Sequence, residues 1–362
     1  MIAEGAMAIG CNFFAGNPIP PAVGIYNSLT RELQQKGLVA MNAPDDESAL
    51  AYCIGASQRG AKAMTVTSGT GWASMIDTFQ YALMTETPVV ISVVQHLGPS
   101  TGGPTRGGQG DIWLVEFASS GGYTIPIFTP SNLKESYELT IHAFNWAERL
   151  RMPVILLTDQ EIANTGESFD YTKLSEIPRF DRQYFSGAGN YVTFEFVPDF
   201  GEIPEFSPIG GENKVTITGA IHNKEGKSLT NSRETMDVLQ HLENKVEYFQ
   251  SDLWMAETDL EPGGETLVIS YGNTARAAEE GVRQARRSGK KVSSIKILSL
   301  FPVPYGPLQQ AAAGVTRIVI PEENRNGQYA QLIRKYFTNQ EIIQINKMGS
   351  PVSPAEIFTE IK

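Results

Sequence analysis

Residues 63–105 read AMTVTSGTGWASMIDTFQYALMTETPVVISVVQHLGPSTGGPT, and the pattern of these residues indicates the fold class. Two runs within it, Ala63–Thr67 and Pro88–Gln95, are almost continuously apolar or β-branched, which is typical of parallel strands that are covered on both faces. Trp72–Met84 between them has the pattern of a helix. A strand, a helix and a second strand in this order predict a unit of a doubly wound, mostly parallel α/β sheet.

The same alternation extends in both directions from this stretch. A helix is predicted over Asp46–Ser57, because the acidic residues that open it suit the free N–H groups and the dipole of a helix start. A long amphipathic helix is predicted over Ser131–Arg149 with Ser131 as its cap, and Pro153–Asp159 is predicted as another buried strand. We therefore expect residues 1–160 to form one α/β domain.

A second α/β pattern fills the C-terminal hundred residues, and we expect residues 265–362 to form another domain. Strands are expected over Thr266–Gly272, Val292–Leu298 and Arg317–Glu323. One helix is expected over Thr274–Ser288, and a second follows Asn324–Gly327 and ends near Phe337.

The segment between the two patterns, residues 161–264, is irregular. Proline, glycine and aromatic residues are scattered through it, and no strong helix is predicted before Glu234–Phe249. Aromatic side chains are costly to leave in water, so a disordered linker fits poorly. We interpret this segment as a connecting arm that wraps a neighbouring subunit.

The composition excludes several classes of protein. The chain of 362 residues has a formal net charge of −11, whereas nucleic-acid binding needs a cationic face. No apolar run approaches the roughly 20 residues of a membrane helix, and the N-terminal run carries Glu4 without a basic leader. We therefore expect a cytoplasmic protein with neither nucleic acid nor a membrane as partner.

Cysteine usage bears on redox chemistry. Cys11 and Cys53 form no CxxC pair, and two thiolates are too few to hold an iron–sulfur cluster. Both lie among small apolar residues, which favours buried, reduced thiols. A redox centre that works with this chain is therefore expected on another polypeptide.

A glycine-rich loop, Val94–Gly110, follows the second buried strand, at the place where open α/β sheets form their ligand crevices. Its glycines allow close approach of a ligand, and Ser100, Thr101 and Thr105 offer hydroxyl groups. The loop lacks the Gly-Lys-Ser/Thr ending of a phosphate loop and the strand–GxGxxG–helix context of a dinucleotide site. By itself the pattern leaves open whether this is a binding site or a structural turn.

A second short glycine turn, Ser68-Gly-Thr-Gly71, ends the first strand and opens the following helix. Such a turn directs backbone N–H groups toward the same crevice. Taken alone, it is better explained as a tight turn between a strand and a helix.

Together these motifs resemble, in order and over most of the chain, the alpha subunits of 2-oxoacid:ferredoxin oxidoreductases. Residues 63–105 are similar to the family patterns AMTATSGPGFSLM, PVVV and RGGPSTGLPT, and FFAGNPIPP at residues 13–21 is similar to F.AGYPITPS. The likeness continues through residues 128–160 and 217–236 and into LVISYGNTARAAEEGVRQAR from residue 267. Only residues 166–208 match loosely.

This resemblance implies a fold and an activity. The first domain would be a pyrimidine-binding domain of thiamine enzymes, and the second a transketolase C-terminal-like domain. The family oxidatively decarboxylates a 2-oxoacid, or runs the reverse reaction, with coenzyme A and ferredoxin. Thiamine diphosphate would be shared with a beta subunit that carries the diphosphate-binding domain, Mg2+ and a 4Fe-4S cluster, and gamma or delta subunits are further possible partners.

The implied chemistry needs a carboxylate beside the pyrimidine ring, where it favours the imino tautomer. In the family this is a glutamate nine residues before the glycine of an IGAS-type segment, and counting back from Gly55 reaches Asp46. Glu47 matches by residue type, but a shift of one residue turns a helix face by about 100°. We favour Asp46 and keep two alternatives, namely Glu47 and a purely helix-capping role for both.

The resemblance also assigns the remaining candidate site residues. The positions expected to contact the cofactor are Pro18, Ile19, Ser68, Gly69 and Gly71. Those expected to contact the substrate are Pro20, His96, Ser100, Thr101 and Thr105.

Three of these positions depart from the family pattern. Pro20 replaces a threonine, His96 replaces an arginine, and Asp46 replaces the glutamate. Proline has no N–H to donate, and histidine offers one bond where a guanidinium offers two. The substrate carboxylate is therefore expected to be held differently, through His96 and the retained Thr105.

Two other functions compete with this interpretation. The altered pocket residues would suit a non-catalytic assembly subunit of the same architecture, although the intact glycine turns and Thr105 argue against it. An independent thiamine enzyme would need a diphosphate-binding half that this sequence does not contain. A nicotinamide dehydrogenase would need the dinucleotide fingerprint, which is missing too.

Overall fold

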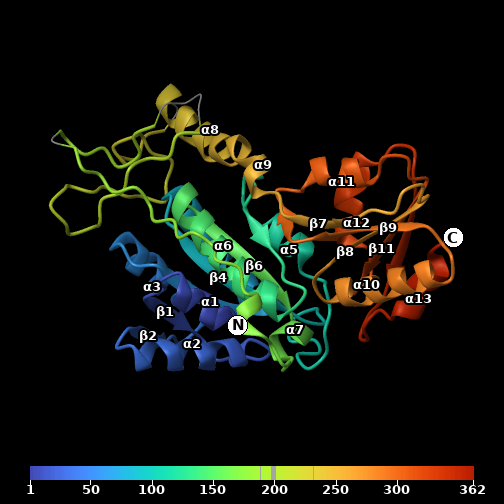
Figure 1. Ribbon diagram of the computed structural model, residues 1–362. Coiled ribbons are helices and arrows are strands. Elements are labelled where there is room, and N and C mark those ends of the chain that lie inside the picture. Colours follow the sequence, from blue (N-terminus) through green and yellow to red (C-terminus); the bar gives the residue numbers. More distant parts are fainter. Residues whose placement is uncertain (188, 197–200, 231) are drawn as a thin grey trace.

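The computed structural model describes residues 1–362 except 188, 197–200 and 231. Two α/β units lie side by side, and a largely irregular segment runs over the first of them (Figure 1). The fold class is α/β, as the sequence predicts.

The first unit is built on a seven-stranded sheet of order β10-β5-β6-β4-β3-β1-β2, in which every pairing is parallel except that of β10 with β5. Its strands are β1 (Phe13–Gly16), β2 (Val39–Asn42), β3 (Ala63–Ser68), β4 (Val89–Gln95), β5 (Ile127–Phe128), β6 (Pro153–Asp159) and β10 (Ser299–Phe301).

The central strands confirm the prediction from the apolar runs. Every residue of β3, β4 and β6 is buried, because helices cover both faces of the sheet. The strands pair in register, with Met64 opposite Val90 and Ile91 opposite Ile155. Each strand ends within one residue of the predicted position.

Helices pack on both faces of this sheet. The helices of the unit are α1 (Ile2–Ala8), α2 (Val23–Gln35), α3 (Asp46–Gln58), α4 (Gly69–Met84), α5 (Ile112–Glu116), α6 (Leu133–Leu150) and α7 (Gln160–Asn164). Helix α3 contacts α4, and α1 contacts both α2 and α6, so these sets form two separate layers.

The predicted cap of the long helix α6 is wrong by one residue. Its cap is Asn132, whose side chain accepts a hydrogen bond from the backbone N–H of Glu135 at 2.9 Å. Ser131 instead donates its hydroxyl to the carboxylate of Glu135 at 2.7 Å. Asparagine and serine are comparable caps, so the residue that first takes an extended conformation at the helix boundary decides between them.

The second unit contains a five-stranded sheet of order β12-β11-β8-β9-β7, parallel except for β7. Its strands are β7 (Ala256–Asp259), β8 (Thr266–Tyr271), β9 (Val292–Ile297), β11 (Arg317–Glu322) and β12 (Glu341–Asn346). Its helices are α10 (Gly272–Arg287), α11 (Tyr305–Ala311), α12 (Gln328–Ile333), a 3-10 turn η2 (Arg334–Tyr336) and α13 (Pro354–Glu360). Helices α10 and α13 cover one face of the sheet, and α11 and α12 cover the other (Figure 1).

The two units are joined by more than the chain between them. Strand β10 follows β9 in the second unit yet pairs with β5 of the first sheet, where Ser299 lies opposite Phe128. One buried apolar cluster runs through both units, from Phe14 beside β3 to Tyr329 in α12. The loops at this junction are therefore held in fixed relation to each other.

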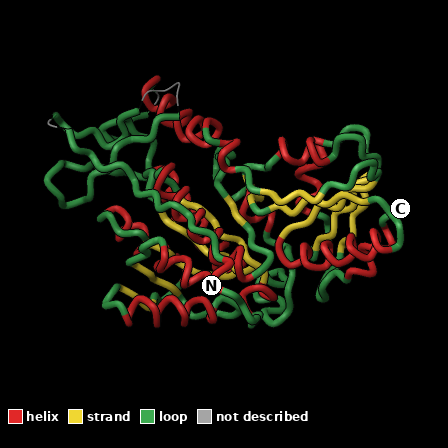
Figure 2. Tube along the Cα trace, in the orientation of Figure 1, coloured by secondary structure: helices red, strands yellow, loops and turns green. Residues whose placement is uncertain are grey.

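The segment between the sheets is mostly loop, as Figure 2 shows. Its regular elements are η1 (Tyr171–Lys173), α8 (Arg233–Tyr248) and α9 (Gln250–Leu253). The described part packs on the first unit of the same chain, where Phe194 and Phe206 are buried and Arg182 donates to both Glu148 carboxylate oxygens, at 2.6 and 2.7 Å. The wrapping of a neighbouring subunit stays a prediction.

None of the helices in the described part of the chain combines the length and apolar character needed to cross a lipid bilayer.

Candidate active site

Asp46 opens helix α3 but does not cap it. The side chain that caps the helix belongs to Asp45, which accepts a hydrogen bond from the Ser48 N–H at 2.7 Å. A capping role for both Asp46 and Glu47 is therefore wrong. Asp46 is only 7% exposed and turns inward to the end of strand β3.

Two neutral donors hold the Asp46 carboxylate. The Thr67 hydroxyl donates to Oδ1 at 2.7 Å, and the Asn17 side-chain amide donates to Oδ2 at 3.2 Å. A carboxylate has about four acceptor positions, so roughly two remain for a ligand. Glu47, by contrast, is exposed, and its Oε1 accepts only a long 3.4 Å bond from Thr78.

Asn17 and Thr67 are site residues that the sequence does not predict. Thr67 ends a predicted strand, and the carboxyl ends of parallel strands line ligand crevices, so its position offers a signal. Asn17 directly precedes the predicted contact Pro18, but an asparagine in a loop carries no comparable pattern.

Gly71 makes the inward turn of Asp46 possible. A Cβ atom at Gly71 would lie 2.2 Å from the Thr67 Oγ1 and 2.6 Å from the Asp46 Cγ. Any larger residue at this position would displace the carboxylate or its donor. The second glycine turn thus has a packing reason that its sequence pattern alone did not reveal.

A cavity of about 660 Å³ lies on the other side of this turn, between the loop after β4 and the loop after β11. The first unit contributes Gly69, Thr70, Ala73, His96, Leu97, Gly98, Pro99, Ser100, Gly108, Gly110, Asp111 and Leu114. The second unit contributes Glu323, Asn324, Arg325, Asn326, Gln328 and Met348.

Direct hydrogen bonds join the two loops. The Gln109 N–H donates to the Glu323 carbonyl at 2.8 Å, and Asn324 returns a bond from its side-chain amide to the Gln109 carbonyl at 2.9 Å. Farther along, the Trp113 indole N–H donates to the Gln328 carbonyl at 3.1 Å. Both units therefore form the walls of the cavity.

The structure brings some predicted substrate residues together and separates others. His96, which is 4% exposed, and Ser100 both line the cavity, and the Nδ1 of His96 lies 3.2 Å from the Leu97 carbonyl. Thr101 and Thr105 are exposed and lie outside this lining.

The predicted cofactor contacts fall into two groups. Ser68, Gly69 and Gly71 are buried at the turn beside Asp46. The segment Pro18–Pro20 follows strand β1 and is exposed or half-buried next to Asn17.

Two acidic groups lie at the junction of the two units, Glu323 in the cavity lining and Asp159 outside it. Burial raises the pKa of Asp159 to about 7, although Asn273, Gln109 and Gln95 donate hydrogen bonds to it and oppose the shift. Burial, with repulsion from Asp159 and Glu161, raises the pKa of Glu323 to about 8.

One further acid lies at the cavity wall. Burial raises the pKa of Asp111 to about 6, and its carboxylate is packed against Gly69.

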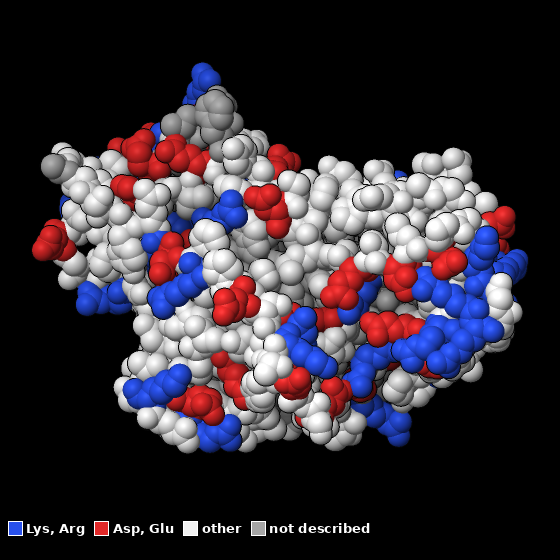
Figure 3. Space-filling model, in the orientation of Figure 1, with Lys and Arg blue, Asp and Glu red and all other residues white. Residues whose placement is uncertain are grey.

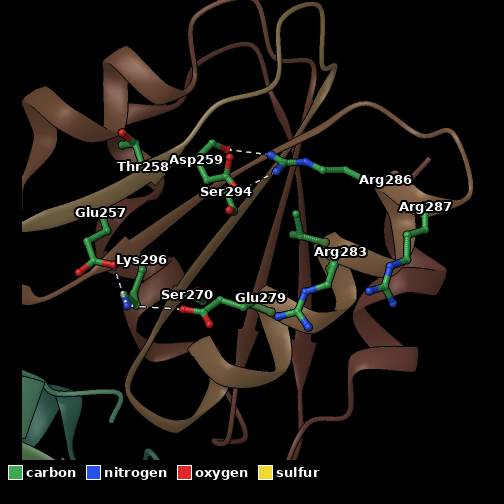
Figure 4. A pocket seen from close by; sticks show the side chains of 12 residues that line it. Glu257, Thr258, Asp259, Ser270, Glu279, Arg283, Arg286, Arg287, Ser294 and Lys296 are labelled. Atoms are coloured by element: carbon green, nitrogen blue, oxygen red, sulfur yellow. Dashed lines mark hydrogen bonds and ion pairs between the residues drawn. The ribbon is translucent and has the colours of Figure 1, made fainter. Parts of the chain in front are cut away.

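A second hollow, of about 700 Å³, lies in the second unit between helix α10 and strands β7 and β9. Basic residues gather over this part of the face shown in Figure 3, with acidic residues among them. Figure 4 shows that the charges pair with each other: Lys296 binds Glu257 at 2.8 Å, and Arg286 binds Asp259 at 2.7 Å. The hollow is therefore largely neutralised from within.

Comparisons with known families agree with the geometry. A model described as pyruvate flavodoxin/ferredoxin oxidoreductase, thiamine diphosphate-binding, matches residues 4–203. A model described as pyruvate:ferredoxin oxidoreductase core domain II matches residues 264–356.

Individual relatives cover most of the chain. The 2-oxoglutarate synthase subunit KorA of Methanocaldococcus jannaschii is 33% identical over 98% of this chain and 94% of its own length. The ketoisovalerate oxidoreductase subunit VorB of Methanothermobacter thermautotrophicus is 28% identical over 95% of this chain and 90% of its own.

A solved structure of 2-oxoglutarate:ferredoxin oxidoreductase from Magnetococcus marinus, with 2-oxoglutarate, coenzyme A and succinyl-CoA bound, superposes with a TM-score of 0.91 at 27% identity. It matches all of this chain, which spans 64% of that longer one. A split-gene transketolase shares only the fold, at a TM-score of 0.56 and 8% identity.

These matches define a class, the thiamine-diphosphate-binding enzymes that exchange electrons with flavodoxin or ferredoxin. Within it, the chain belongs to the family of 2-oxoacid:ferredoxin oxidoreductase alpha subunits, as the resemblance in its motifs implies. Several relatives are named as subunits of larger enzymes, which indicates that such chains work with partners.

Proposed function

We propose that this chain supplies the pyrimidine-side half of a thiamine-diphosphate site, with Asp46 as the activating carboxylate, in an enzyme that oxidises 2-oxoglutarate. The observation that carries the proposal is the position of Asp46, buried at a helix start and held by Thr67 and Asn17. Asp46 is favoured over Glu47 because Glu47 is exposed.

The donor set fits the pyrimidine side of the cofactor. Thr67 and Asn17 are neutral donors, so they orient the carboxylate without cancelling its charge. Asp46 would accept a hydrogen bond from a protonated ring nitrogen and so stabilise the imino tautomer of the aminopyrimidine. The backbone at Ser68–Gly71 and the segment Pro18–Ile19 would border the ring. When bound, thiamine diphosphate supplies the nucleophilic carbon that a 2-oxoacid decarboxylation requires.

The remaining parts of the enzyme are assigned to a partner. Both cysteines are buried as free thiols, and burial raises the pKa of Cys11 to about 12, so the thiolate form that metals need is disfavoured. We place the 4Fe-4S cluster, Mg2+ and the diphosphate-binding domain on a beta subunit, with ferredoxin as electron acceptor and coenzyme A as acyl acceptor.

The proposed substrate follows from the relatives. The matched proteins include 2-oxoglutarate synthase subunits, and the superposed solved structure is titled with bound 2-oxoglutarate. His96 and Ser100, which line the cavity, are the residues of the first unit proposed to bind the substrate.

The test is a reconstituted complex with its partner subunit, assayed for 2-oxoacid-dependent reduction of ferredoxin or a viologen dye. We expect Asp46→Asn, which keeps size and the Thr67 contact, to lower kcat about 100-fold or more, the contribution typical of an acid–base group. Glu47→Gln is the matched control, and its kcat should stay within about twofold of the wild-type value. Circular dichroism and co-purification with the partner confirm that each variant folds and assembles.

Two results would reject the proposal. A wild-type complex that assembles but reduces no dye with any 2-oxoacid would favour the non-catalytic assembly subunit, which the departures at Pro20 and His96 would then explain. Tight binding of thiamine diphosphate by the isolated chain would contradict the division of the site between two subunits.

A further inference from the structure

Arg325 is a cationic side chain that the proposed chemistry at Asp46 leaves unused. It lies in the loop between β11 and α12 and lines the 660 Å³ cavity together with His96 and Ser100. It is exposed, and it makes no ion pair with any residue in the described ranges, unlike Arg283 and Arg286 at the second hollow. Its guanidinium is therefore free to bind an anion that enters the cavity.

The loop that carries Arg325 is rigidly built. The side-chain oxygen of Asn324 accepts hydrogen bonds from the backbone N–H groups of Gly327 at 2.7 Å and of Asn326 and Gln328 at 3.2 Å each. The Asn324 amide in turn donates to the Gln109 carbonyl at 2.9 Å and to Glu322 at 2.8 Å. Arg325 is thus presented from a loop that is fixed before any ligand binds, which lowers the entropic cost of binding.

The nearest acid on this loop competes little for the guanidinium. Glu323 accepts hydrogen bonds from Asn273 at 3.2 Å and from the Val352 N–H at 3.3 Å. Burial and the neighbouring carboxylates Asp159 and Glu161 raise the pKa of Glu323 to about 8, so the group is mostly neutral at pH 7. Asp111, whose pKa burial raises to about 6, is packed against Gly69 of the first unit.

Polar side chains from both units thus line one cavity. His96 and Ser100 lie on the loop of the first unit, next to the turn that also positions Asp46, and Arg325 lies on the loop of the second unit. A 2-oxoacid with a second carboxylate at the end of its side chain has matching chemistry at its two ends. A 2-oxoacid with a short apolar side chain offers nothing for Arg325 to bind.

We propose that Arg325 is a specificity-determining residue, which binds the distal carboxylate of a dicarboxylic 2-oxoacid. This inference rests on the proposed function. It adds that discrimination between dicarboxylic and monocarboxylic 2-oxoacids comes from the second unit, whereas activation comes from the first.

The experiment compares kcat/KM for 2-oxoglutarate and for 2-oxobutyrate, which lacks the distal carboxylate, in the reconstituted complex. We expect Arg325→Gln to lower kcat/KM for 2-oxoglutarate about 10- to 100-fold, mainly through KM, because a charge-assisted hydrogen bond is lost. The value for 2-oxobutyrate should change less than about twofold. Arg325→Lys should recover part of the preference, because it restores the charge without the planar fork.

Arg287→Gln is the matched control, because it removes an exposed arginine of the same unit that lines the other hollow. It should leave kcat/KM for both oxoacids unchanged. If Arg325→Gln lowers kcat/KM for both oxoacids equally, the inference is overturned while the proposed function stands. The same holds if it raises KM for coenzyme A without changing the ratio of the two kcat/KM values. If the wild-type complex oxidises no 2-oxoacid, the proposed function itself fails, and the inference fails with it.

Discussion

Asp46 and Glu47 are adjacent acids at one helix start, and only their surroundings separate them. Asp45 provides the cap, so Asp46 can turn toward Thr67 and Asn17, while the next residue faces solvent. A step of one residue along a helix turns the side chain by about 100°, which is enough to move a carboxylate from the crevice to water.

At this scale we predict that Gly71→Ala impairs catalysis more than folding. The added Cβ would lie 2.2 Å from the Thr67 Oγ1 and 2.6 Å from the Asp46 Cγ, so the carboxylate must move. We expect kcat of the reconstituted complex to fall about 10- to 100-fold, the effect of a misplacement near 1 Å. Gly55→Ala, where a Cβ meets no atom within 4 Å, is the control. Equal activity of the two variants would show that Asp46 tolerates displacement.

A second prediction concerns His96, which replaces the arginine of the family pattern. If its ring binds the substrate in the cavity, His96→Ala should raise KM for every 2-oxoacid tested, about tenfold, because one polar contact is lost. Kinetics across a panel of 2-oxoacids provide the measurement. Unchanged KM values would remove His96 from the site and leave its contact with the Leu97 carbonyl as a purely structural one.

Among the elements, helix α8 is held to the first unit by charges that are completely buried. Lys245 on this helix donates to Glu86 at 3.0 Å, and His241 lies 3.1 Å from the same carboxylate oxygen. Burial opposes ionisation of Glu86, but Lys245 and His241 together hold its pKa well below the usual range. The middle segment is thereby attached to the sheet by an interaction that no apolar pattern in the sequence reveals.

Removing one member of the Lys245–Glu86 ion pair should destabilise the protein strongly. Lys245→Met leaves the Glu86 carboxylate buried without its main partner, and we expect unfolding to become easier by about 3–5 kcal/mol. Lys134→Met, which removes an exposed partner of Glu138 on helix α6, should cost under about 1 kcal/mol. Denaturant unfolding of the isolated chain measures both. A similar loss in the two variants would mean that the buried pair contributes no more than a surface pair.

Across the whole molecule, the junction of the two units should make stability depend on pH. Burial raises the pKa of Asp159 from 3.8 to about 7, so the folded chain binds a proton there that the unfolded chain has released between those values. Stability is therefore highest below about pH 4 for this group, declines as pH rises toward 7, and levels off above it. Each unit of difference between the folded and unfolded pKa values changes the free energy of unfolding by about 1.4 kcal/mol.

The corresponding variant is Asp159→Asn, which cannot titrate. We expect the wild-type free energy of unfolding to fall between pH 5 and pH 8, and the variant to show a shallower slope, whatever its stability at pH 5. Glu323 remains in both proteins, so the difference between the slopes isolates Asp159 and its coupling to that neighbour. Parallel curves would mean that Asp159 titrates at its ordinary pKa.

The main helices and strands of this protein, and its family, are predictable from the sequence. Strands that are buried on both faces must be apolar throughout, so β3, β4 and β6 were evident from composition, and the ordered motifs around them indicated the alpha-subunit family. Only the packing of the elements showed that Asp46 turns inward to Thr67 and that Arg325 lines the same cavity as His96. The reason is physical, because periodicity reports the environment of a face along one element, whereas contacts between loops depend on how separate elements pack.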